Sequence, residues 1–162
     1  MRHQGASSRT SIQQRPATSF AVLILASLVG CEDGTNRVES DATEAVVRHV
    51  LRDAGTNKPP VLFLAIGHRL TAPDETLLAR FATHHPPVKS YEASRVSPTG
   101  DFVDKASGKT GALLQIAKVE KRSSTEFEIE AALSSLPMNS NRFVYTVIQQ
   151  GGRWTIKNQR PL

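Results

Sequence analysis

This chain is poor in cysteine, in aromatic residues and in long apolar runs. A single cysteine, Cys31, stands among 162 residues, so no disulfide bond can form within the chain. Aromatic residues make up 6% and are scattered, which disfavours a stacking platform for sugars or nucleic-acid bases. No heptad repeat or glycine period is present, and no apolar run allows a multi-pass membrane protein. The 39% of hydrophobic residues falls into patterned segments, which indicates one folded domain.

Acidic side chains are missing from the first 15 residues, which contain Arg2, Arg9 and Arg15. An apolar run of ten residues follows at 20–29, with Ser27 as its one polar side chain. A positive segment followed by a short apolar segment is typical of an export signal. Ten residues are too few to cross a hydrocarbon core about 30 Å thick, so we expect a signal peptide rather than a transmembrane anchor.

The apolar run ends in Leu28-Val29-Gly30-Cys31. This segment resembles the lipobox of bacterial lipoproteins, in which a small residue precedes a cysteine. The resemblance implies that the Cys31 thiol receives a diacylglyceryl group, that signal peptidase II cuts between Gly30 and Cys31, and that the new N-terminus is acylated. Two or three acyl chains give stable anchoring, so the lipid bilayer is an expected partner of an exported, envelope-bound protein. The alternative is a free cysteine beside an ordinary signal peptide or in a buried helix.

A clustered basic stripe is also missing, so nucleic acid is not an expected partner. Removal of residues 1–30 would take away three of the 20 Lys and Arg side chains and none of the 15 acidic ones. The net charge would fall from +5 to +2. Residues 31–40 are short and polar, and we expect them to be a lipidated tether that carries a single domain, residues 41–162.

Apolar residues at helical spacing predict two helices. The first is expected to begin at Asp41, which forms a capping box with Glu44, and to end near Gly55. The second is expected over Thr71–His84, with Thr71 as its N-cap. Between them, the apolar run 61–67 predicts a buried strand, with a short buried helix as the alternative.

The second half of the sequence changes to the period of a strand. Residues 127–131 place apolar side chains on one face and Glu126, Glu128 and Glu130 on the other. The pair Gly151-Gly152 predicts a tight hairpin before the last strand. The expected fold class is therefore α+β, a curved antiparallel sheet of four to six strands with two helices packed on one face.

This element order, together with the terminal segment Gly151–Ile156, resembles the nuclear-transport-factor-like superfamily, a cone-shaped fold shared with ketosteroid isomerase and the related cystatin-like folds. The resemblance implies that sheet and helices surround a pocket, which some members use for catalysis and others for binding or dimerisation. No catalytic residue of that family matches a residue of this chain, so none is carried over.

Four side chains are candidates for the lining of such a pocket. They are His49, beside the apolar stripe of the first helix, His68, at the end of the expected buried strand, and Tyr145 and Trp154, on the last strands. The alternative for both histidines is a structural role with satisfied hydrogen bonds. The alternative for Trp154 is a place in the core.

Acid, metal and nucleotide chemistry have weak support in the sequence. Asp101 and Asp104 could act as general acid or base in a pocket, or simply form turns. The three glutamates on one strand face could bind a cation, but a solvated face with nearby lysine and arginine is the alternative.

Adjacent residues such as His84-His85 cannot point the same way on a helix, and no partner lies at metal-ligand spacing, so no metal or other cofactor is expected. Ser107–Thr110 resembles the tail of a P-loop but lacks its first glycine, so a hairpin turn is favoured.

The expected function is that of a noncatalytic binding or scaffolding domain, displayed at the cell envelope by the lipid anchor. Its partner would be an envelope protein or a second copy of the chain. Two alternatives from other classes stay open. A pocket-containing cone-fold enzyme, of isomerase or hydrolase type, would need an inward His, Asp or Glu with a perturbed pKa. A homo-oligomeric assembly module would need an exposed apolar sheet face.

Overall fold

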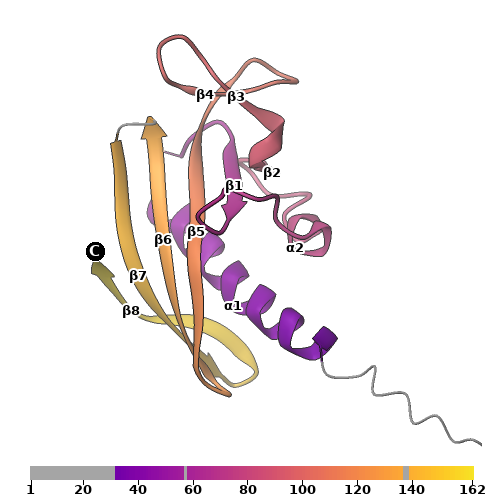
Figure 1. The fold of residues 1–162 in the computed structure, drawn as a ribbon, viewed down its shortest axis with the longest axis vertical. Helices are drawn as coiled ribbons and strands as arrows, with labels where there is room; N and C mark the ends of the chain where they lie inside the picture. The colour runs from indigo at the N-terminus through magenta and orange to yellow at the C-terminus, as the bar shows by residue number, and fades with distance from the viewer. Residues whose placement is uncertain (1–31, 57, 137–138) are drawn as a thin grey trace, which may run out of the picture.

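The fold is a curved sheet with one long helix across its inner face (Figure 1). The computed structural model describes residues 32–56, 58–136 and 139–162. In chain order the elements are α1 (Glu32–Asp53), β1 (Leu62–Ile66), α2 (Glu75–Ala79), β2 (Val88–Ser90), the 3₁₀ helix η1 (Tyr91–Ala93), β3 (Ser94–Val96), β4 (Phe102–Asp104), β5 (Thr110–Ser123), β6 (Glu126–Leu136), β7 (Asn139–Gln150) and β8 (Arg153–Pro161).

The sheet is mostly antiparallel and has the strand order β2-β1-β5-β6-β7-β8. The four long strands β5 to β8 form a meander, whereas β1 runs parallel to both β2 and β5. A hairpin of β3 and β4 joins the sheet at the start of β5. The α+β class is thus confirmed, but the sheet has eight strands in the described chain instead of four to six.

Helix α1 begins at Glu32, nine residues before the expected start. The segment after Cys31, expected as a tether, is therefore helical. No proline interrupts it, and Val38 extends the apolar stripe by packing against the core. Asp41 and Glu44 lie inside the helix, so the predicted capping box is wrong. Both carboxylates accept hydrogen bonds from the Arg80 guanidinium, at 2.6 and 2.8 Å.

Helix α2 is much shorter than the expected 71–84, because turns follow it from Arg80 onward. Asp74, not Thr71, is the N-cap, and its side chain accepts a hydrogen bond from the Thr76 amide at 2.6 Å. Thr71 instead bridges back to Ile66, through both backbone and side chain. The predicted packing of two helices on one face of the sheet therefore differs from the structure: α1 alone spans the sheet, and α2, with five residues, contacts mainly β2.

The main core lies between α1 and the inner face of the sheet. Phe127, Ile129 and Val147 are fully buried there, as the alternation in the sequence predicts. A second, smaller cluster on the outer face packs under the β3–β4 hairpin and includes Phe63 and Phe102. Strand β1 is thus covered on both faces, which explains its continuous apolar run.

Gly151 and Gly152 form the predicted hairpin between β7 and β8. Their φ angles are 56° and 77°, the left-handed values that a type I′ turn requires at both central positions. A residue with a side chain would be strained at either place, so the glycine pair fixes the register of the last strand.

Gly111 is needed for the close approach of β5 to β1. A Cβ atom there would lie 2.5 Å from the backbone oxygen of Val61 and 2.7 Å from Cε2 of Phe63. We expect Gly111→Ala to lower the free energy of unfolding by about 1–3 kcal/mol, as overpacked cores do. Urea denaturation measures this, with the neighbouring exposed Thr110→Ala as control. An unchanged midpoint for Gly111→Ala would mean that β1 shifts at no cost.

Candidate binding pocket

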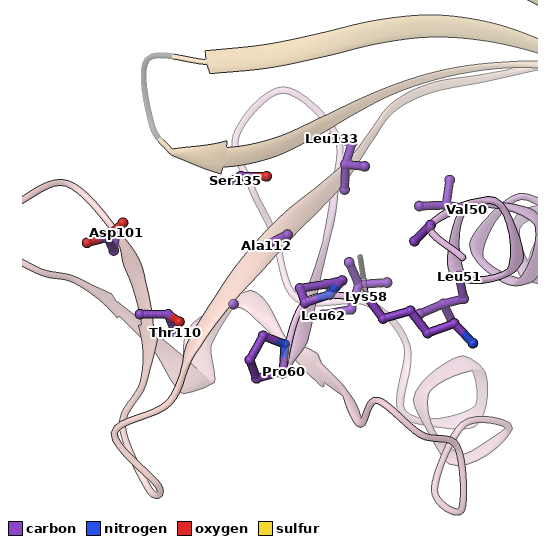
Figure 2. A pocket seen from close by; sticks show the side chains of 13 residues that line it. Val50, Leu51, Lys58, Pro60, Leu62, Asp101, Thr110, Ala112, Leu133 and Ser135 are labelled. Carbon is purple, nitrogen blue, oxygen red and sulfur yellow. The ribbon is translucent and has the colours of Figure 1, made fainter. Parts of the chain in front are cut away.

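An open pocket lies at the C-terminal end of α1, where the helix, the loop that follows it and the sheet meet (Figure 2). Its volume is about 440 Å³, within the range of small-molecule sites. Its lining comes from five segments of the chain. They contribute Val50, Leu51 and Ala54 from the end of α1 and the turn after it, Lys58, Pro59, Pro60 and Leu62 from the following loop and β1, Asp101 from the β3–β4 turn, Thr110, Gly111 and Ala112 from β5, and Leu133 and Ser135 from β6.

The centre of the pocket is apolar. Leu51, Leu62 and Ala112 belong to the main core, so the pocket is a continuation of that core toward solvent. Pro59 and Pro60 form part of the wall, and proline has no backbone N–H to offer a ligand. This surface favours an apolar ligand body over one that carries many hydroxyl groups.

The charged groups of the pocket stand at opposite sides. Figure 2 shows Asp101 on the side of the β3–β4 turn and the Lys58 side chain running toward α1. Asp101 is held in a turn, because its Oδ2 accepts a hydrogen bond from Thr99 Oγ1 at 2.7 Å and its amide donates to Ser97 Oγ at 3.0 Å. None of the ion pairs among the described residues includes Lys58.

None of the four candidates from the sequence lines this pocket. His49 and Trp154 line a separate groove between α1 and β8, of about 550 Å³. Tyr145 is next to His49, with ring centroids 5.6 Å apart at 77°. Trp154 packs edge-on against Phe127, with the ring centroids 5.3 Å apart. His68 is exposed on the turn after β1 and lines a third groove, on the outer face.

His49 connects the helix to the sheet. Its Nε2 lies 3.0 Å from Gln159 Oε1 and 3.1 Å from Asp53 Oδ2, and its Nδ1 lies 3.4 Å from a guanidinium nitrogen of Arg52. Both ring nitrogens thus face protein groups, which favours the structural interpretation. Burial, with a smaller contribution from the Asp53 charge, raises the pKa of Tyr145 to about 12, so this phenol stays protonated at neutral pH.

Asp104 is buried at the β4–β5 hairpin, outside the pocket. Its Oδ2 accepts hydrogen bonds from Lys89 Nζ at 2.8 Å and from the Ser107 hydroxyl at 2.5 Å. These hydrogen bonds lower the pKa of Asp104 to about 2, and the bond from Lys89 has the largest effect. The Ser107 amide also donates a hydrogen bond to this carboxylate. The first residue of the P-loop-like segment Ser107–Thr110 is therefore part of a hairpin turn that the Asp104 side chain stabilises.

The row of glutamates on β6 is part of a charged outer face. Glu128 accepts hydrogen bonds from Arg122 and Arg160, at 2.9 and 2.7 Å. Lys157 lies 3.9 Å from Glu126. Within the described residues, no group of three or more His, Cys, Asp or Glu side chains is placed to hold a metal ion.

The lipobox residues Gly30 and Cys31 lie outside the described residues. In the part of the chain that is described, no helix has both the length and the apolar character to cross a bilayer. Comparison with known proteins finds no matching family model, no matching curated protein and no matching solved structure.

Proposed function

We propose that this protein is a bacterial lipoprotein, anchored at the cell envelope through Cys31, whose domain binds a small apolar ligand without transforming it. The observation that carries the binding role is the open, apolar pocket at the end of α1. The order of basic segment, apolar run and Gly30-Cys31 supports the anchor. A pocket between a helix and a curved sheet also agrees with the resemblance to the cone fold.

A binding role is favoured over catalysis by the placement of the ionisable groups. General acid–base chemistry needs such groups within hydrogen-bond reach of the reacting atoms. Lys58 and Asp101 instead flank an apolar centre from opposite sides (Figure 2). The two groups with strongly shifted pKa values, Asp104 and Tyr145, do not line the pocket.

A binding role is also favoured over assembly through the open sheet face. That face carries the charged pairs of Glu128 with Arg122 and Arg160. Among the described residues, the large hydrophobic side chains that are exposed are Val96 and Leu162. Two scattered side chains make a poor apolar interface.

Binding can be tested with N-phenyl-1-naphthylamine, a neutral dye that fluoresces in apolar sites. We expect saturable fluorescence with the wild-type protein and at least about tenfold weaker binding with Leu133→Arg, which puts a charge into the apolar centre. The control Val96→Arg, on the outer face, should bind the dye like the wild type. Circular dichroism checks that both variants fold. Absence of saturable fluorescence with the wild type, or equal losses in both variants, would refute binding in this pocket.

A further inference from the structure

We infer that the ligand of this pocket is a single-chain amphipathic anion, of the fatty-acid class, with its head group at Lys58 and its alkyl chain across Leu62 and Leu133. This inference rests on the proposed function, since it names the kind of molecule that the same pocket would hold.

The polarity of the pocket sets the position of the head group. Lys58 is an exposed cation at the α1 side, outside every ion pair among the described residues. Asp101 provides negative charge at the other side, where the neutral hydroxyl groups of Thr110 and Ser135 also line the pocket. An anionic head group is therefore attracted to one end and repelled from the other. The one carboxylate in the lining that could pair with a cationic ligand is that of Asp101, and its Oδ2 already accepts a hydrogen bond from Thr99.

The centre of the pocket sets the chemistry of the rest of the ligand. Val50, Leu62, Ala112 and Leu133 offer carbon surface and no side-chain hydrogen bond. Each methylene group buried there is worth about 0.8 kcal/mol, or about fourfold in affinity. A volume of about 440 Å³ lies in the lower half of the range for small-molecule sites, which favours one alkyl chain over a two-chain lipid.

The test displaces the bound dye with amphiphiles that share one chain but differ in head group. Decanoate, decanol and decyltrimethylammonium are titrated below their micelle concentrations. We expect decanoate to displace the dye at about fivefold lower concentration than decanol, the scale of a partly exposed ion pair. Decyltrimethylammonium should be the weakest. Octanoate should be about sixteenfold weaker than decanoate, from the loss of two methylene groups.

Two lysine variants assign the head group. Lys58→Met should lose the preference of decanoate over decanol, with both compared against the dye affinity measured for the same variant. Lys121→Met removes an exposed lysine that does not line the pocket, and should keep that preference. A preference that survives in Lys58→Met, or falls equally in both variants, would overturn the inference.

The outcomes separate this inference from the proposed function. Equal displacement by decanoate and decanol, with the dye bound, would refute the anionic ligand and leave apolar binding intact. Failure of the dye itself to bind the wild type would refute both. Tighter displacement by decyltrimethylammonium would place the head group at Asp101 and also overturn the inference.

Discussion

Replacement of Cys31 by serine should release this protein from the membrane. Serine lacks the thiol that would receive the diacylglyceryl group, so the variant would carry no acyl chain. Since stable anchoring takes two or more chains, we expect nearly complete transfer to the aqueous phase. The full chain, expressed in a bacterium, is partitioned between aqueous and detergent phases of Triton X-114, and incorporation of labelled palmitate is followed in parallel.

A matched control changes the neighbouring residue instead. Gly30→Ala keeps a small side chain before the cysteine, so this variant should stay in the detergent phase and keep its label. Complete partition of Cys31→Ser into detergent would show that the anchor lies elsewhere in the chain. Loss of both variants from the detergent phase would mean that anchoring also requires glycine at position 30, so that the comparison would not single out the thiol.

Replacement of Lys89 by methionine should lower the free energy of unfolding by about 2 kcal/mol at pH 7. The variant leaves the Asp104 carboxylate buried without its cation. The hydrogen bond from Lys89 is the largest cause of the shift of the Asp104 pKa from 3.8 to about 2, and Ser107, which the variant keeps, supplies a further part. Removal of one partner of a buried charged group costs about 1–3 kcal/mol. Urea denaturation measures the difference. Lys109→Met, exposed on the same hairpin, should have little effect.

The effect of Lys89→Met should depend on pH in a defined direction. Because the pKa of Asp104 is depressed in the folded state, its contribution is fully present above about pH 5 and is lost as the pH falls from about 4 to about 2. The stabilities of wild type and variant should therefore converge over that interval. A difference that stays constant between pH 7 and pH 2.5 would mean that Lys89 acts through the packing of its aliphatic stem, not through its charge.

Local patterns predicted the parts of the fold that depend on neighbouring residues. The two faces of β6 and the hairpin at Gly151-Gly152 follow from alternation and backbone freedom alone. Strands β2, β3 and β4 have three residues each, too few to show a period, and exist because of their partners. The predicted capping box is wrong because α1 begins at Glu32, and the carboxylates of Asp41 and Glu44 instead bind Arg80, which is 39 and 36 residues away.

The pocket could not be predicted because its residues carry no local motif. In the sequence, side-chain chemistry points to residues such as His49 and Tyr145. The pocket is built instead from aliphatic side chains, prolines and a glycine that five separate segments bring together. Asp101, a possible acid or base from its sequence position, does line the pocket, and its hydrogen bond from Thr99 agrees with the turn-forming alternative.

With the proposed lipid on Cys31, the early start of α1 would place a helix between the anchor and the pocket. Its 22 residues form a rod about 33 Å long, and the pocket lies at the end farthest from Glu32. A flexible linker after Cys31 would let the domain reorient, so that its pocket could contact the bilayer. A helical spacer would instead hold the opening of the pocket in the aqueous compartment. An amphiphile would then have to leave the membrane, or be transferred by another protein, before it could bind.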